Sequence, residues 1–193
     1  MPNTKKLYLI LALAAGICGA QGAPPTARTR SVVAEGAGTF VSSAEIAALL
    51  ASAATGAVAD NVLRVVPVDG EYNVGVSVVR RVKVAGKTPT DAVRHHDVTE
   101  VYQVLKGNGI LAIGGSIEGE TELPSGEAVV RNVIGPSSVG KSITGGVRQR
   151  VAAGDVVIIP ANTPHGFIEL TSDEITYLLV RVDPHRVLAQ KAH

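Results

Sequence analysis

Two short stretches of this chain carry residue types that bind transition metals. The first contains His95, His96 and Glu100, and the alternating apolar run after it is typical of a strand that would hold the carboxylate on one face. The second carries His165 directly after an apolar run and a proline-bounded turn. Because these side chains come from stretches far apart in the chain, the sequence predicts a metal site that is assembled by tertiary folding.

The elements that must position these residues are mainly β-strands. Hydrophobic residues make up 46% of the 193-residue chain but aromatic residues only 3%, so Val, Ile, Leu and Ala must fill the core. Short β-branched runs separated by turn residues are typical of a sandwich or barrel. The expected strands cover residues 62–68, 72–84, 98–105, 110–113, 129–134, 147–151, 156–159, 165–170 and 175–182.

One helix is expected ahead of the strands. Ser42, followed three residues later by Glu45, forms a capping-box pattern, and the apolar residues within 46–50 recur at helical spacing. Thr55 and Gly56 are expected to end this helix. The predicted fold class is therefore all-β with a short N-terminal helix.

The first residues of the chain have the composition of an export signal. Lys5 and Lys6 precede an apolar run over residues 7–17, and small residues continue to Ala23. The apolar run is shorter than the ~20 residues that a membrane helix needs, so no stable membrane insertion is expected after cleavage. The only cysteine, Cys18, lies in this segment. The exported protein, periplasmic or secreted, is therefore predicted to lack disulfides and thiol ligands.

The rest of the chain is long enough for one domain with a sizeable core. We expect a signal peptide at 1–23, a lead-in with the helix at 24–60, the β-domain at 61–185 and a polar tail at 186–193. The formal net charge is +1 and no basic stripe stands out. This charge pattern argues against a nucleic-acid partner.

The stretch around Glu100 resembles the first motif of the cupin superfamily, whose members are small β-barrels. That motif runs glycine, five residues, His-x-His, three or four residues, glutamate, six residues, glycine. Six residues separate Glu100 from Gly107, as in the motif. Four residues lie between His95 and Glu100, and three lie between His96 and Glu100. The first histidine of His-x-His is missing, since a valine or an arginine stands at its position.

The later stretch resembles the second cupin motif, which runs glycine, five residues, Pro-x-Gly, two residues, histidine, three residues, asparagine. Gly154, Pro160 and His165 fit this pattern, but Asn162 and Glu169 stand in place of the glycine and the asparagine. Asparagine tolerates left-handed backbone better than most residues, so the first replacement is compatible with the same turn. Together the two motifs imply a cupin-type antiparallel β-barrel, or jelly roll.

The resemblance implies a divalent metal ion (Fe, Mn, Zn, Ni or Cu) held by His95, Glu100 and His165. His95 is preferred because four residues separate it from Glu100, as in many cupins, while His96 stays an alternative or additional ligand. Both can bind only if the backbone bulges, because adjacent strand residues point to opposite faces. Glu169 is a further candidate, since alternation along a strand would place it on the same side as His165.

Two functions follow from the resemblance. A metal with open coordination positions implies metal-assisted chemistry on a small molecule, of the dioxygenase, decarboxylase, isomerase or lyase type. The alternative is a non-catalytic small-molecule-binding or storage barrel, which the missing histidine favours. A homodimer is a further expectation. The residues expected to contact a small-molecule ligand are Tyr102, Phe167, Arg148, Arg150 and Arg181.

Residues 135–142 match the P-loop pattern literally, with Lys141 and Ser142 at its end and residues 129–134 as the strand before it. A P-loop needs a helix to begin at this point, but two adjacent glycines follow closely and are poor helix formers. The strand-dense chain also leaves no room for crossover helices. We therefore expect no nucleotide site and interpret the segment as a flexible loop between the two cupin-like motifs.

Overall fold

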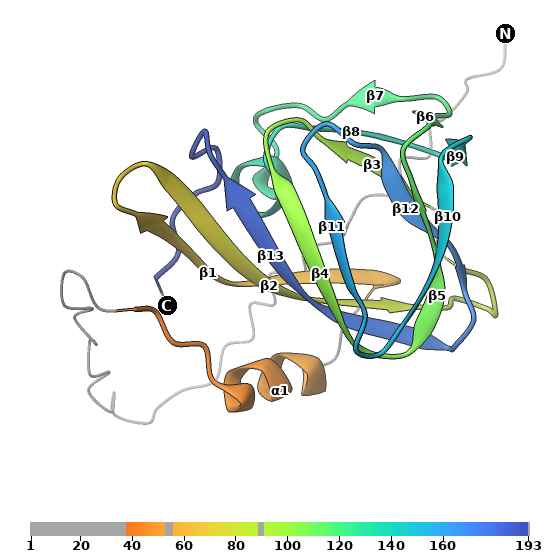
Figure 1. Cartoon of the computed structure of the whole chain (residues 1–193), viewed down its shortest axis with the longest axis horizontal. Helices are drawn as coiled ribbons and strands as arrows, with labels where there is room; N and C mark the ends of the chain where they lie inside the picture. Colours follow the sequence, from red (N-terminus) through yellow and green to blue (C-terminus); the bar gives the residue numbers. More distant parts are fainter. Residues whose placement is uncertain (1–37, 53–55, 89–90, 193) are drawn as a thin grey trace, which may run out of the picture.

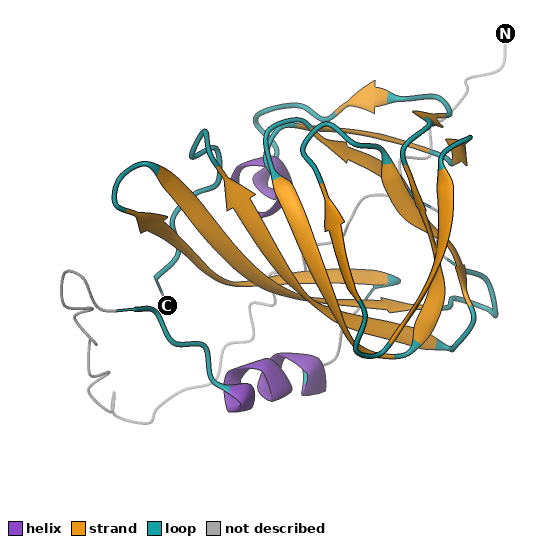
Figure 2. Ribbon diagram, in the orientation of Figure 1, coloured by secondary structure: helices purple, strands orange, loops and turns teal. Residues whose placement is uncertain are grey.

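The computed structural model describes residues 38–52, 56–88 and 91–192. The expected signal peptide at 1–23 and residues 24–37 and 53–55 of the lead-in lie outside the described residues. Within the described chain, no helix is both long and apolar enough to cross a bilayer. Strands are the dominant element, and one α-helix lies beside them (Figures 1 and 2).

The predicted helix is present as α1 (Ser43–Ala51) and starts as its capping box indicates. Ser42 Oγ accepts a hydrogen bond from the Glu45 amide at 3.1 Å, and the Glu45 carboxylate accepts one from the Ser42 amide at 2.9 Å. Glu45 also forms an ion pair with Arg64, which ties the helix to the first strand. The helix ends at Ala51, earlier than predicted, where the Ser52 amide bonds back to the helix.

The strands follow the helix. Within the described residues they are, in chain order, β1 (Val58–Val68), β2 (Tyr72–Val82), β3 (Ala92–His95), β4 (Thr99–Lys106), β5 (Asn108–Ile113), β6 (Ser116–Ile117), β7 (Thr121–Glu122), β8 (Ser137–Gly140), β9 (Ile143–Thr144), β10 (Val147–Ala152), β11 (Val156–Ile159), β12 (His165–Leu170) and β13 (Glu174–Asp183).

Two sheets of antiparallel strands face each other. One contains the order β2-β13-β4-β11 and the other the order β10-β5-β12-β3. This is the strand order of a jelly roll, in which two Greek keys share two sheets. The predicted all-β fold with an antiparallel jelly roll is thus confirmed. Within the described residues the two sheets remain separate, so the fold is a sandwich and not a closed hydrogen-bonded barrel.

Additional strands lengthen both sheets beyond the jelly roll. β1 pairs with β2 at the edge of the first sheet, and β8 pairs with β3 in the second, followed by β7. The C-terminal residues pack against β1, where Leu188 is buried and Lys191 exchanges backbone hydrogen bonds with Val65. Part of the segment expected as a polar tail therefore contributes to the core.

The space between the sheets is filled by alternate strand residues that point inward. The rings of Tyr102 and Tyr177 stack with their centroids 4.5 Å apart, and the Phe167 ring lies 5.9 Å from that of Tyr177. These rings pack among buried aliphatic side chains, namely Val79, Val104, Leu111, Val151, Ile159, Leu170, Ile175 and Leu179. Three of the six aromatic residues of the chain thus lie in its core, whereas Phe40 and Tyr72 are exposed.

The predicted strand at 129–134 is wrong, because these residues form a π-helical turn, η1 (Val130–Ile134). Its buried residues, Val130 and Val133, are three positions apart, which suits a helical turn and not the alternation of a strand. The chain leaves the turn at Gly135, whose φ is 70°. The sequence also gives no indication of β3 and β8, which contain few β-branched residues.

Candidate metal centre

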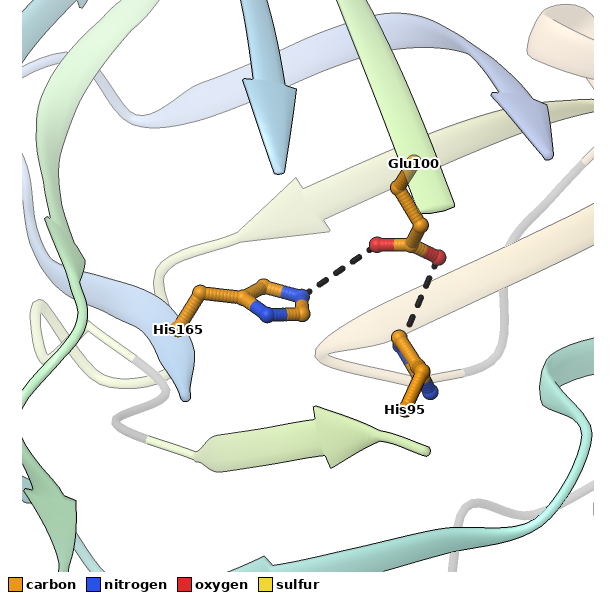
Figure 3. A group of neighbouring side chains, drawn as sticks. All are labelled: His95, Glu100 and His165. Atoms are coloured by element: carbon orange, nitrogen blue, oxygen red, sulfur yellow. Dashed lines mark ion pairs between the residues drawn. The ribbon is translucent and has the colours of Figure 1, made fainter. Parts of the chain in front are cut away.

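The two cupin-like motifs meet where the ends of three strands lie together. His95 is the last residue of β3 and His165 the first residue of β12, whereas Glu100 lies at the start of β4 in the facing sheet. The three side chains point toward one another (Figure 3). Their exposed fractions are 5% for His95, 2% for His165 and 1% for Glu100. One donor atom from each lies within 4.8 Å of the other two.

Both imidazole rings present the same nitrogen to the carboxylate. His165 Nε2 lies 3.2 Å from Glu100 Oε2, and His95 Nε2 lies 3.3 Å from Glu100 Oε1. On the other side of the His165 ring, Nδ1 lies 2.9 Å from the carbonyl oxygen of Thr163. A carbonyl oxygen only accepts hydrogen bonds, so Nδ1 carries the proton. A neutral His165 therefore has its lone pair on Nε2.

A serine fixes His95 in the same way. His95 Nδ1 lies 2.8 Å from Ser137 Oγ, and Ser137 Oγ itself donates to the carbonyl oxygen of Gly135 at 2.9 Å. Because the hydroxyl proton is used on that carbonyl, Ser137 accepts the Nδ1 proton of His95. The lone pair of a neutral His95 is therefore also on Nε2 and faces Glu100.

When both rings are neutral, two nitrogen lone pairs therefore face the two oxygens of one carboxylate. Within the described chain, the buried Nε2 of His165 has no hydrogen-bond partner. Burial, reinforced by the positive charge of Arg181, lowers the pKa of His95 to about 3, so this ring is neutral at pH 7. A buried acceptor without a donor is unfavourable. A divalent cation bound by all three groups would remove the repulsion between the nitrogen lone pairs and the carboxylate oxygens. The residues therefore fit a transition-metal ion.

Glu100 is held from both sides by hydrogen-bond donors. Tyr102 Oη donates to Oε2 at 2.9 Å, and Arg181 Nε donates to Oε1 at 2.9 Å. Burial alone would raise the pKa of Glu100, but the cationic neighbours, His95 when protonated and Arg181, hold it well below its usual range. Burial and the nearby Glu100 charge raise the pKa of Tyr102 well above its usual range, so its hydroxyl stays a donor. Glu100 is therefore an ionised and oriented carboxylate.

The remaining nitrogens of Arg181 also bind protein groups. Nη2 lies 2.5 Å from Asp60 Oδ2, and Nη1 donates to Ser77 Oγ at 3.1 Å. Arg181 and Glu100 stand directly opposite each other in the ladder between β13 and β4. Arg181, expected to contact an anionic ligand, is therefore buried as a partner of Glu100.

The two further candidate ligands lie away from this centre. His96 points outward, where its Nε2 lies 3.0 Å from the exposed carboxylate of Glu122. Glu169 is exposed because the ladder of β12 shifts register between Phe167 and Glu169. This bulge breaks the alternation that would have placed Glu169 beside His165.

The other expected ligand contacts fall into two groups. Tyr102 and Phe167 are buried in the aromatic cluster, and Tyr102 reaches the centre through its hydrogen bond to Glu100. Arg148 and Arg150 are exposed on β10, an edge strand. A surface hollow of about 520 Å³ includes Arg150, and another of about 240 Å³ includes Arg148. Neither hollow is lined by His95, Glu100 or His165, so a role of Arg148 and Arg150 in ligand binding stays a prediction.

Three residues that hold the centre carry no signal in the sequence: Ser137, Asp60 and Ser77. Ser137 belongs to the P-loop-like stretch, which forms strand β8 where a flexible loop was expected. The pairing of β8 with β3 places Ser137 opposite His95. Asp60 and Ser77 enter the site only through the pairing of strands distant in sequence from β13. Isolated polar residues in β-rich runs are the one feature that they share, and that feature is not specific.

No protein-family model matches the chain, and a search of curated proteins found no match. Similar solved structures include the cupin domain of Cnp3 from Schizosaccharomyces pombe (8% identity, TM-score 0.41, 68% of this chain and 65% of that one). Another is an HTH_3 family transcriptional regulator from Vibrio cholerae (10% identity, TM-score 0.38, 67% of this chain and 52% of that one). A third is oxalate oxidase in complex with glycolate (19% identity, TM-score 0.40, 68% of this chain and 53% of that one). The chain spans about half to two thirds of the length of these three chains. Because these TM-scores are low, the jelly-roll fold is inferred from the strand order and not from the similarity to these structures.

Proposed function

We propose that this protein, a jelly roll that carries both cupin-like motifs, binds one divalent transition-metal ion and uses it in chemistry on a small molecule. The ligands would be His95 Nε2, His165 Nε2 and the Glu100 carboxylate. The observation that carries the proposal is the convergence of two imidazole Nε2 atoms, which carry the lone pairs of the neutral rings, on one ionised, buried carboxylate. Hydrogen bonds on the far side of each ring orient these lone pairs.

Two imidazoles and one carboxylate form the donor set typical of non-haem Fe(II) oxygenases, and a bound ion would supply Lewis acidity and open coordination positions. Oxygenation is therefore the reaction class that the donor set favours among those expected. The chain itself supplies two further groups at the carboxylate. Tyr102 keeps its phenolic proton on the hydrogen bond to Oε2, and Arg181 keeps a positive charge at Oε1.

The metal content of the purified, untagged protein tests the proposal. After loading with a divalent metal and removal of the excess, we expect one ion per chain in the parent. Glu100→Gln, His165→Ala and His95→Ala should each lose most of it, because each removes one donor. His96→Ala is the matched control and should keep its metal, since His96 faces Glu122. Full metal retention by both Glu100→Gln and His165→Ala would contradict the shared site.

The second candidate function is a non-catalytic binding or storage protein. It is favoured by the burial of all three donors and by the aromatic cluster that fills the interior beside them. Cobalt(II) substitution distinguishes the two functions, because cobalt reports its coordination through visible absorption. If open coordination positions are accessible, added azide should change the spectrum. An unchanged spectrum at saturating azide would favour the storage function.

We propose in addition that the mature protein acts outside the cytoplasm. The support is the order of Lys5 and Lys6, the apolar run at 7–17 and the small residues up to Ala23. Intact-mass measurement of the protein recovered from the exported fraction should show a chain that begins between Gln21 and Pro24. A mass that still includes the first twenty residues would reject the cleavage, and absence from that fraction would reject export.

A further inference from the structure

A strand outside the jelly roll contributes a charge to the metal centre. Asp60 lies on β1, which extends the first sheet beyond β2. Its carboxylate contacts both terminal nitrogens of Arg181, with Oδ2 2.5 Å from Nη2 and Oδ1 3.4 Å from Nη1. Arg181 in turn reaches Glu100 through Nε at 2.9 Å. The contacts therefore run from β1 through β13 to β4 within one sheet.

This group of charges is largely removed from water. The side-chain exposed fraction is 10% for Asp60, 3% for Arg181 and 1% for Glu100. Ser77 on β2 accepts a further hydrogen bond from Arg181 Nη1 at 3.1 Å. Every nitrogen of the guanidinium thus has an acceptor, and its planar fork fixes the direction of Nε toward Glu100.

The net charge of Glu100, Asp60 and Arg181 affects how strongly the site attracts a cation. Glu100 and Asp60 each carry one negative charge and Arg181 one positive charge, so the group is net negative before a metal binds. If Asp60 were neutral, the positive charge of Arg181 would cancel the charge of Glu100, and the group would have no net negative charge to attract the ion. Burial keeps this interaction from being screened as it would be at the surface.

We propose that Asp60 and Arg181 form a positioning pair for the metal centre. Arg181 holds Glu100 in its ligating orientation, and Asp60 both fixes Arg181 and neutralises its charge so that a divalent cation can bind. The inference rests on the proposed metal binding by His95, Glu100 and His165. It assigns to β1 a role in metal affinity that the jelly roll itself does not supply.

The test compares Asp60→Asn with a matched control, Asp91→Asn. Asp91 binds another buried arginine, Arg81, at 2.7 Å, and Arg81 bonds onward to Tyr177 and not to Glu100. Zinc affinity is measured by competition with a chromophoric chelator, at a temperature where circular dichroism shows each metal-free variant to be folded. We expect zinc affinity to fall about 10- to 100-fold in Asp60→Asn. It should stay within about twofold of the parent in Asp91→Asn.

Affinity measured in the folded state separates positioning from a purely structural role, which would lower only the melting temperature. Parent-like affinity in Asp60→Asn would overturn the inference and leave the proposed function standing. A parent that binds no metal would reject the proposed function and this inference together. If Asp60→Asn does not fold, Ser77→Ala decides, because it removes one neutral acceptor of Arg181. We expect a drop of about two- to tenfold for Ser77→Ala, and an unchanged affinity would overturn the inference.

Discussion

Glu100 is a charged residue in an apolar interior, and its contacts explain how the fold accommodates it. An unpaired buried carboxylate destabilises a fold by several kcal/mol. Here a phenol and a guanidinium donate to it, and two imidazoles lie within 3.3 Å. The donors on the two sides leave the direction toward His95 and His165 free for a cation. The residue that looks least compatible with a β-run is therefore the centre of the site.

Ser137→Ala tests how far the orientation of His95 matters. The substitution removes the acceptor of the Nδ1 proton while leaving the ligand itself in place. We expect metal affinity to fall about 10- to 100-fold, as is usual when a group that orients a ligand is lost. Ser138→Ala is the control, since this neighbouring buried serine bonds to Glu120 instead. Equal affinities of the two variants would show that the serine does not set the tautomer of His95.

The pH dependence of stability follows from His95. Its pKa is lowered from the ordinary 6.5 to about 3, so between these values the unfolded chain binds a proton that the folded chain does not. Stability should therefore fall as the pH drops from about 6.5 toward 3, by up to about 1.4 kcal/mol per pH unit from this group. The lowered pKa of Glu100 acts in the same direction below its ordinary value of 4.5.

Urea unfolding of the metal-free protein at several pH values between 7.5 and 4 measures this slope. His95→Gln should flatten it, because the variant has no ring to protonate in the unfolded state. A slope that is the same in parent and variant would assign the acid sensitivity to other groups.

Among the elements, strands with continuous β-branched runs could be predicted from the sequence, and β11 and β12 have the predicted bounds. β3 and β8 could not, because polar residues interrupt the alternation and only their pairing with neighbours defines them. The outward position of Glu169 also escaped prediction, since the bulge in β12 depends on its pairing with β5. The local sequence pattern therefore predicts strands that have continuous β-branched runs, but it does not predict bulges in the hydrogen-bond ladder between strands.

The turn between β4 and β5 shows why a cupin-like motif ends in glycine. Gly107 has a φ of 81°, and a Cβ there would lie 2.1 Å from the carbonyl oxygen of Glu174. Gly70, between β1 and β2, has a similar φ of 72° but nothing within 4 Å of its Cβ position. Gly70→Ala should lower the free energy of unfolding by about 1–2 kcal/mol, from backbone conformation alone.

Gly107→Ala should lower the free energy of unfolding by clearly more, because the backbone must also move away from β13. Chemical denaturation of the two variants side by side gives the comparison. A loss for Gly107→Ala no larger than that for Gly70→Ala would show that the close approach is not a constraint.

For the whole molecule, the jelly roll explains why two motifs far apart in the chain form one site. β3 and β12 are neighbours in one sheet, and β4 begins in the facing sheet just after β3 ends. The motif spacing predicts His95, Glu100 and His165 as a group. It does not predict the residues that support them, because Asp60, Ser77 and Ser137 reach the site through strands that the motifs do not include.

Metal should add to the stability of a protein that already folds without it, because Arg181 and Tyr102 partner the Glu100 charge in the metal-free state. At a free metal concentration 100 times the dissociation constant, the expected gain is about 2.7 kcal/mol. Thermal unfolding with and without metal measures the gain, which should disappear in Glu100→Gln. An unfolded metal-free parent, or an equal gain in Glu100→Gln, would contradict this expectation.

The central claim is that one metal ion binds between His95, Glu100 and His165. Anomalous diffraction at the zinc edge, from crystals of the zinc-loaded protein, tests it most directly. We expect one strong peak within bonding distance, about 2.0–2.2 Å, of both Nε2 atoms and of a Glu100 oxygen. Zinc found at His96 and Glu122 instead, or no peak among the three buried side chains in a crystal that binds zinc elsewhere, would contradict the claim.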